Sequence, residues 1–364
     1  MRRHFDAYAD INWGATEFIV RRDDPRWVLS KSDLLGSHRW YQGQSSSRQI
    51  AIGLARQANI AKVAAQFESI LVRGLMHYSF RLPNGSPEFR YCVHESVEEC
   101  NHMMMFQELI DRTGVDAHGV RLWLRLLSSA LPHSATLAPN AFFFGVLAGE
   151  VPFDRTQADL LRTDDPIHPM VEQVVAIHLA EEARHIAFAH AYLSRNVRGM
   201  PRPNRFLLSL YVPLITRLLC NALLVPPRTF FAEFEIPRSV RREAFFSDPS
   251  SRRRLRDMYG DTRMLCEQVG LMNPVALLVW RACGIGGRPA RYRGEPQRRN
   301  LGEDRQADSS AAGPLRTGGP ANHQPSFGNV GNRVQVLRAE IPGRGTVHRH
   351  QQTGSGQAHH HAPQ

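Results

Sequence analysis

The pattern Glu-Glu-x-x-His occurs twice in the sequence, at residues 98–102 and 181–185. In each copy the second Glu and the His are three residues apart, which gives the pairs Glu99/His102 and Glu182/His185. Positions i and i+3 share one face of a helix, so each pair can direct a carboxylate and an imidazole at one point. One such pair alone would as readily lie on a solvated helix face. Two copies inside apolar helical stretches predict a centre that holds two metal ions.

A two-metal centre in a four-helix bundle also takes one lone carboxylate from each of two further helices. Glu68 is the best candidate before the first pair, because it is the only acidic residue between Ser46 and Phe80. Glu150 is the best candidate before the second pair, because it follows the uncharged stretch 141–149. An isolated Glu in an apolar helix is costly to bury unless positive charge meets it. The chain order therefore alternates a lone Glu with a Glu/His pair, as in ferritin-like proteins.

One residue goes beyond this arrangement. His178 lies four residues before Glu182 and seven before His185. Positions i, i+4 and i+7 form one helical stripe, so all three side chains can reach the same metal face. His178 alone would more often be a core histidine, but its place on this stripe favours a seventh ligand. Glu98 and Glu181 stay open between hydrogen-bonding a metal ligand and facing solvent.

The candidate ligands resemble those of the AurF-like di-iron oxygenases, the p-aminobenzoate N-oxygenase family: Glu68, Glu99, His102, Glu150, His178, Glu182 and His185. The resemblance covers roughly residues 25–290. It implies that these side chains bind iron, that His178 adds a third imidazole, and that an aryl amine is oxidised through hydroxylamine towards nitro. Glu181 stands where di-iron proteins often have an Asp that hydrogen-bonds a ligand His of another helix. No substrate-binding residue is carried over.

Long helical patterns must position these residues. Candidate ligands fall in expected helices at about 46–80, 87–113, 138–162 and 166–196, and a shorter helix is expected at 117–131. Pro152 lies just past Glu150 and is expected to kink its helix. Alternation of period two is almost absent, so the predicted class is all-α. We expect a ferritin-like four-helix bundle with a di-metal centre, additional helices and a disordered C-terminal tail.

The chain divides by composition into three parts. Residues 1–44 form an expected N-terminal arm that packs on the bundle through Trp13, Trp27, Trp40 and Tyr41. Residues 45–290 are the expected ferritin-like di-iron oxygenase domain. Residues 291–364 are predicted to be a disordered basic tail, because its Gly, Pro, Gln and Arg cannot bury enough surface to offset the ordering entropy.

The formal net charge of +11 does not indicate a nucleic-acid partner. From Ile285 onward eleven Arg face five acidic residues, a net of +6, so more than half of the excess charge lies near the C-terminus. No nucleic-acid-binding motif accompanies it. The five cysteines are scattered and form no CxxC motif, which favours a reducing cytoplasm over a disulfide framework or a zinc site. The N-terminal residues lack the apolar region of a secretory signal, which is consistent with a cytoplasmic protein.

The stretch Phe206–Val225 is apolar and long enough to raise the question of a membrane span. Pro213, Arg217 and Asn221 interrupt it. A charged side chain within a span is expensive, so we expect a buried or interfacial helix, and membrane association is not expected.

The leading functional hypothesis is a di-iron monooxygenase with two iron ions, or manganese ions in their place. Reducing O2 takes electrons that closed-shell side chains cannot supply, whereas two irons can supply two. N-oxygenation of an aryl amine is the sharper version. The alternatives are a hydroxylase or desaturase acting on a C–H bond, a non-catalytic ferritin-like iron-binding protein, and a helical scaffold with a vestigial site.

The expected partners follow from the chemistry. An oxygenase needs O2 and a small-molecule substrate. No reductase or ferredoxin motif is present, so the electrons are expected from an external donor of one of these kinds. A homodimer is also compatible with the sequence.

Overall fold

The computed structural model describes residues 4–295, and every regular element in that range is helical. The absence of strands from residues 4–295 confirms the predicted all-α class. Residues 296–364, which make up most of the predicted tail, lie outside the described residues.

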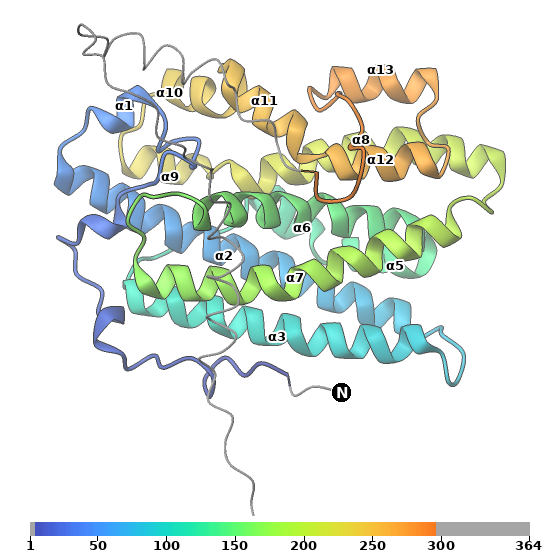
Figure 1. Cartoon of the computed structure of the whole chain (residues 1–364), viewed down its shortest axis with the longest axis horizontal. Helices are drawn as coiled ribbons and strands as arrows, with labels where there is room; N and C mark the ends of the chain where they lie inside the picture. Colours follow the sequence, from blue (N-terminus) through green and yellow to red (C-terminus); the bar gives the residue numbers. More distant parts are fainter. Residues whose placement is uncertain (1–3, 296–364) are drawn as a thin grey trace, which may run out of the picture. The chain divides into compact units, whose positions relative to one another are not determined.

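Four long helices form the bundle, and their bounds lie close to the predicted ones: α2 (Ser46–Ser79), α3 (Pro87–Thr113), α6 (Pro139–Leu161) and α7 (Pro169–Asn196). A Pro at the first helical position starts α3, α6 and α7, where its missing N–H has no helical partner to lose. Gly114 ends α3 in the left-handed conformation, with φ +61°. Helix α2 packs against α3 and α6, and α7 packs against α3 and α6 (Figure 1).

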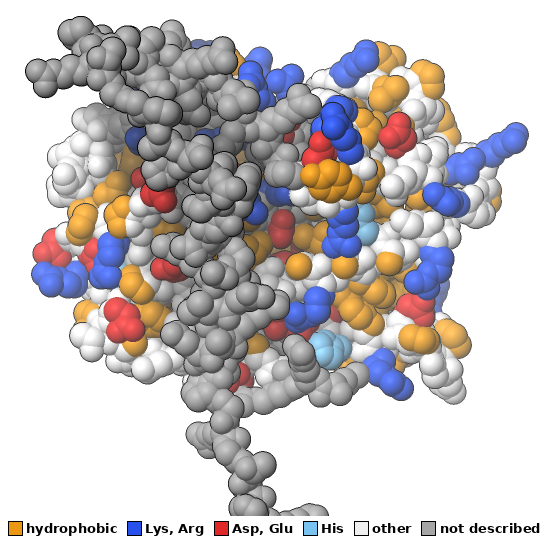
Figure 2. All heavy atoms as spheres, in the orientation of Figure 1, with side chains coloured by type: hydrophobic (Ala, Val, Ile, Leu, Met, Phe, Trp, Pro, Cys, Tyr) orange, Lys and Arg blue, Asp and Glu red, His pale blue; other side chains and the backbone are white. Residues whose placement is uncertain are grey.

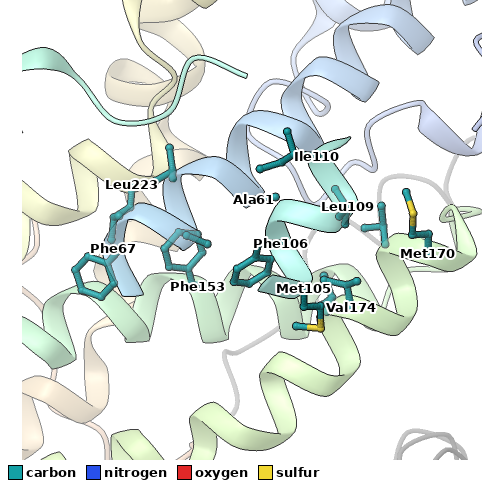
Figure 3. Packing of buried hydrophobic residues seen from close by; sticks show 14 of the residues in the cluster. Ala61, Phe67, Met105, Phe106, Leu109, Ile110, Phe153, Met170, Val174 and Leu223 are labelled. Atoms are coloured by element: carbon teal, nitrogen blue, oxygen red, sulfur yellow. The ribbon is translucent and has the colours of Figure 1, made fainter. Parts of the chain in front are cut away.

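Apolar side chains from all four helices fill the space along the bundle. Figure 3 shows Phe67 of α2, Phe153 of α6 and Phe106 of α3 lying close to one another in this core. The approach of α2 to α6 depends on Gly149, since a Cβ there would lie 1.7 Å from the Phe67 ring. Phe67 and Gly149 each precede a candidate ligand, so this close approach also brings Glu68 towards Glu150.

Six further helices follow the bundle: α8 (Arg202–Leu224), α9 (Arg228–Glu233), α10 (Arg238–Arg242), α11 (Pro249–Met258), α12 (Gly260–Gln268) and α13 (Pro274–Ala282). Helices α8 and α11 pack against α6, and α13 packs on α8 (Figure 1, yellow-green to orange). Among residues 4–295, only the helical segment Arg202–Glu233 is long and apolar enough to cross a membrane. In the structure, 61% of the most apolar 18-residue window of this segment is buried. A core helix of a soluble protein can also be this long and apolar.

The predicted helix at 117–131 is wrong. Helix α4 covers only Leu122–Leu127, and the 3-10 helix η3 (Leu131–His133) and α5 (Ser134–Leu137) lead into α6. Gly119 has φ +70°, which a right-handed helix cannot include. Side chains of α2 hold this segment instead, because Asn59 accepts from the Gly119 N–H and Gln66 accepts from the Val120 N–H.

Residues of the N-terminal segment pack on the bundle. This segment contains η1 (Thr16–Phe18), η2 (Pro25–Trp27) and α1 (Arg39–Gln42). The buried Trp27 indole stacks on the His168 ring, with 4.3 Å between ring centroids. The Tyr41 hydroxyl is buried and accepts from the Leu29 N–H at 2.8 Å. Aromatic anchors therefore fix the arm next to the start of α7.

Basic side chains do not gather in one patch on the part of the surface visible in Figure 2. Arg and Lys lie scattered among acidic and apolar residues there.

Candidate metal centre

Eight buried Glu and His side chains meet in the middle of the four-helix bundle, and they fall into two adjacent groups. Within each group, one possible ligand atom of every residue lies within 4.8 Å of the others. We call these groups the first position, formed by Glu68, His102, His178 and Glu182, and the second position, formed by Glu95, Glu99, Glu150 and His185. The structure thus brings together all seven residues singled out in the sequence and adds Glu95.

Glu95 is the residue that the sequence analysis missed. It lies four residues before Glu99 and seven before His102 on α3, the spacing that drew attention to His178 on α7. Applying the same i, i+4, i+7 rule to both Glu-Glu-x-x-His copies would have found it. Only 2% of Glu95 is exposed, so it belongs to the interior as fully as the predicted residues do.

Two carboxylates connect the two positions. Glu99 Oε2 lies 2.9 Å from His102 Nδ1, and Glu99 Oε1 lies 2.7 Å from His185 Nδ1. Glu182 Oε1 lies 3.3 Å from His178 Nε2, 3.5 Å from His185 Nδ1 and 3.6 Å from His102 Nδ1. Each of these two carboxylates therefore faces imidazoles of both positions, which is the placement of a bridging ligand.

Each imidazole turns one nitrogen inward and offers the other to a side chain behind it. The outer nitrogens of His102 and His185 lie 2.9 Å from Glu181 and Glu98, respectively. The outer nitrogen of His178 lies 2.8 Å from the amide oxygen of Gln157. An outer N–H that donates to such an acceptor leaves a lone pair on the inner nitrogen, as a metal ligand requires.

The role left open for Glu98 and Glu181 is thus answered by contacts across the α3–α7 interface. Each carboxylate accepts from the His ligand candidate of the opposite helix. Arg184 pairs with both, through a contact to Glu98 and a 3.3 Å contact to Glu181. Gln157, like Glu95, was not foreseen, although it lies seven residues after Glu150 and so on the same face of α6.

Several carboxyl groups of the centre are buried close together, which disfavours their ionised forms. Burial raises the pKa of Glu68 and Glu150 well above the usual range, and neighbouring carboxylates add to the effect. Burial raises the pKa of Glu95 to about 8. Burial also raises the pKa of Glu182, with repulsion from Glu99 as the next cause. Without cations, burial therefore favours the protonated form of these carboxyl groups.

The imidazoles respond in two ways. Burial opposes the charged form of His102, yet Glu99 and Glu181 outweigh it and raise its pKa to about 9. Burial and the neighbouring His102 hold the pKa of His178 well below its usual value. Glu99 is itself buried, but His185 and His102 outweigh that burial and hold its pKa well below the usual range.

Much of the hydrogen-bonding capacity of the centre is unused, although His102 Nδ1 lies 2.9 Å from Glu99 Oε2 and His178 Nε2 lies 3.4 Å from Glu68 Oε1. Among the described residues no hydrogen-bond partner exists for these buried atoms: Glu68 Oε2, Glu95 Oε2, Glu99 Oε1, both oxygens of Glu150, both oxygens of Glu182, and His185 Nδ1. The 2.7 Å approach of Glu99 Oε1 to His185 Nδ1 lacks hydrogen-bond geometry. Buried oxygens without donors are costly, so this donor set fits cations that the inward atoms would bind.

A third group of possible ligands, His4, His94 and Glu98, lies on the outer side of His185. Its members His4 and His94 are half-buried, and Glu98 is already bonded to His185 and Arg184. This group is therefore a weaker candidate than either position of the centre.

A cavity adjoins the His178 side of the first position. Its wall includes Phe106, whose ring centroid lies 5.0 Å from that of His178, and Gln157, which bonds His178. Apolar side chains such as Ile60 and Val174 form much of the remaining wall. Arg56 also lines the cavity, and its buried Nη1 has no hydrogen-bond partner among the described residues.

Comparison with known proteins gives one family. The sequence model for p-aminobenzoate N-oxygenase AurF matches residues 1–270. "Uncharacterized protein Rv0885" of Mycobacterium tuberculosis (strain ATCC 25618 / H37Rv) is 57% identical over 301 residues, which cover 83% of this chain and 88% of that protein. "Uncharacterized protein Mb0909" of Mycobacterium bovis (strain ATCC BAA-935 / AF2122/97) shows the same identity and coverage. No solved structure matches the chain.

Proposed function

We propose that this chain, which belongs to the p-aminobenzoate N-oxygenase AurF family, binds two iron ions and N-oxygenates an amine. The family is one of di-iron oxygenases, so its members use O2 and an organic substrate. The proposal specifies the iron ligands, the reaction at nitrogen and the place of the substrate.

The observation that carries the proposal is the inward-facing donor set of the two positions. It offers carboxylates and imidazoles on four helices, with buried oxygens that have no donor among residues 4–295. We assign the metal ligands to the seven residues expected from the sequence: Glu68, Glu99, His102, Glu150, His178, Glu182 and His185. When bound, the iron pair supplies the electrons that activate O2.

The protein's own part is to orient and to exclude water. Glu98, Glu181 and Gln157 hold the outer N–H of the three imidazoles and so fix the direction of each inner lone pair. The Phe67, Phe106 and Phe153 rings belong to one apolar core cluster (Figure 3), and the Phe106 ring centroid lies 5.0 Å from that of His178. A dry wall strengthens the electrostatic interactions inside it and limits side reactions with water.

We place the substrate in the cavity beside His178, with its amine towards the first position. The apolar wall suits an aryl or alkyl body. Arg56 Nε is paired with Asp33 at 3.2 Å, so only its unpartnered Nη1 is left to meet an acidic group at the far end. Arg56 and Glu68 are twelve residues apart on α2. That separation is about 18 Å along a helix, so an acid held by Arg56 belongs to an elongated amine rather than a single-ring one. The reducing equivalents come from an external reductase or ferredoxin.

The test begins with anaerobic reconstitution and metal analysis. We expect about two irons per chain, as the paired ligand sets imply. The loaded protein is then given O2 and a chemical reductant with a panel of short aryl amines, elongated amino acids and fatty acids. Formation of hydroxylamine or nitro product supports the proposal, whereas hydroxylation of C–H bonds without amine oxidation identifies the alternative enzyme. Two irons without turnover of any substrate would favour an iron-binding protein.

A blocking variant tests the place of the substrate. Ile60 lines the cavity and is not a metal ligand candidate. Ile60→Trp should lower product formation at least about tenfold while iron content stays unchanged, since bulk fills the pocket without touching the centre. Unchanged turnover in this variant would place the substrate elsewhere.

A further inference from the structure

Helices α3 and α7 each carry a stripe of three candidate ligands, and the two stripes differ at one residue. On α3 the stripe is Glu95, Glu99 and His102, and on α7 the stripe at the same spacing is His178, Glu182 and His185. The second and third members are the same in both stripes. Only the first member differs, with a carboxylate on α3 and an imidazole on α7.

This difference makes the donor sets of the two positions unequal. The first position offers two carboxylates and two imidazoles, and the second offers three carboxylates and one imidazole. Without Glu95, the second position would have two carboxylates and one imidazole and so would be one donor short of the first.

The surroundings of Glu95 point to a ligand rather than to a space-filling side chain. It is buried, and one of its oxygens lies within 4.8 Å of ligand atoms of Glu99, Glu150 and His185. The Tyr91 hydroxyl interacts with this carboxyl, but Oε2 has no hydrogen-bond partner among the described residues. A buried carboxylate that served only packing would need donors for its oxygens, whereas a cation at the second position would satisfy them.

We propose that Glu95 is an eighth metal ligand, and that it gives the second position a relative preference for manganese that the first position lacks. The inference rests on the proposed two-metal centre and goes beyond the seven ligands that the family resemblance implies. It concerns the chain's choice of metals, not the reaction that follows.

The physical reason is the difference in ligand hardness. Carboxylate oxygens suit manganese, whereas imidazole nitrogens suit iron, and at a given site Fe(II) binds more tightly than Mn(II). Replacing an imidazole with a carboxylate reduces the advantage of iron. From a mixture of the two ions, manganese should therefore enter the second position before the first.

The test uses the full chain, freed of metal and offered equal Fe(II) and Mn(II) without oxygen. Elemental analysis and the electron paramagnetic resonance of Mn(II) report the metals bound, independently of activity. Glu95→His copies the α7 stripe onto α3 and should lower the bound Mn-to-Fe ratio by at least about fivefold, with total metal near two per chain. His178→Glu copies the α3 stripe onto α7 and should raise the ratio. The double swap should return it towards that of the original chain.

Two further variants guard the interpretation. Glu108→Gln removes a partly exposed carboxylate from the same helix and should leave the ratio unchanged. Glu95→Gln preserves the shape of the side chain and should weaken binding of one of the two metals by about tenfold or more. This second measurement decides the matter if Glu95→His fails to fold.

The outcomes separate this inference from the proposed function. If the original chain holds two metals but Glu95→His leaves the ratio unchanged, or Glu95→Gln leaves both affinities unchanged, Glu95 is not a ligand and the proposed function stands. A chain that cannot hold two metals overturns both. A ratio that falls in Glu95→His and recovers in the double swap supports the inference.

Discussion

Helices α3 and α7 carry the same chemical pattern, yet they treat it differently. Each helix has a Glu that faces the two metal positions. Each helix also has a His whose outer nitrogen lies within hydrogen-bond distance of a carboxylate of the other helix. The two stripes differ at their first residue. His178 is oriented by Gln157, whereas no partner among the described residues reaches Glu95 Oε2. The comparison teaches that a repeated motif fixes where the candidate ligands lie, while a single exchange changes the donor set that each position offers.

The strongest test of whether the α3 and α7 stripes are equivalent removes the middle carboxylate of each, Glu99 or Glu182. Glu99→Ala and Glu182→Ala should each lose at least one metal and lower turnover by about 100-fold or more, because each carboxylate faces both positions. Metal analysis and a product assay check this, with far-ultraviolet circular dichroism to confirm that the helices persist. Retention of two metals in either variant would contradict its assignment as a bridging ligand.

The same pair should differ when no metal is bound. Glu99 is held ionised by His185 and His102, whereas burial raises the pKa of Glu182. Removing one partner of a buried pair costs about 3–5 kcal/mol, so Glu99→Ala should destabilise the metal-free protein by roughly that amount. Glu182→Ala should cost less, since it removes a carboxylate that burial already disfavours. Denaturant unfolding of the two metal-free variants compares them, and an equal loss would remove this distinction between the stripes.

The pH dependence of stability tests whether the folded, metal-free centre holds protons that the unfolded chain has released. Burial raises the pKa of Glu95 to about 8, and Glu99 and Glu181 outweigh burial to raise that of His102 to about 9. A raised folded-state pKa stabilises the fold at low pH, and that contribution is lost as pH rises through the folded-state value. Between about pH 7 and 9 the unfolded chain has already released these protons.

The metal-free protein should therefore lose stability across that window, by about 1.4 kcal/mol per pH unit for each proton held only in the folded state. Bound cations replace these protons, so the metal-loaded protein should change much less. Thermal midpoints of the metal-free and metal-loaded forms give the comparison. The loaded form carries Mn(II), which avoids oxidation. A metal-free midpoint that rises towards pH 9 would contradict the pKa directions of the centre.

The outer carboxylates allow a smaller test of the same symmetry. Glu98→Gln and Glu181→Gln keep an acceptor but remove the charge behind each His. Loss of such an outer partner commonly weakens metal binding about 10- to 100-fold. Both carboxylates pair with Arg184, and we expect the larger loss for Glu98, whose side chain is 4% exposed against 13% for that of Glu181. Metal titrations of both variants measure this, and affinities equal to that of the original chain would show that the outer bonds are unimportant.

The sequence predicts the bundle and most of the centre because both depend on helical spacing. Long apolar helical stretches place four helices to within a few residues, and the i, i+3 and i+4 rule places their ligands on common faces. Glu68 and Glu150 stood out because burying a lone acid needs compensation. The assignment of metal ions to these side chains remains a prediction.

What the sequence did not predict depends on contacts between distant segments. The expected helix at 117–131 failed because α2 side chains hold the Gly119 and Val120 N–H groups, which no local pattern indicates. Gln157 lies seven residues after Glu150, but it is an uncharged amide, so only its contact with His178 identifies its role. Glu95 was the avoidable omission, because its spacing to Glu99 and His102 is visible in the sequence.

The smallest expected effect concerns the one imidazole that bonds an amide. Gln157→Glu would give His178 a carboxylate partner like those of His102 and His185, and should leave metal content unchanged while strengthening His178 as a donor. Gln157→Leu removes the acceptor and frees the His178 ring to turn, so the affinity of one metal should fall by about tenfold. Metal titration and the optical spectrum of the loaded protein compare the variants with the original chain. Because Gln157 also lines the cavity, product formation alone cannot separate metal tuning from substrate contact, whereas metal affinity can. Equal affinities in all three proteins would mean that packing against Phe106, and not the amide, holds His178 in place.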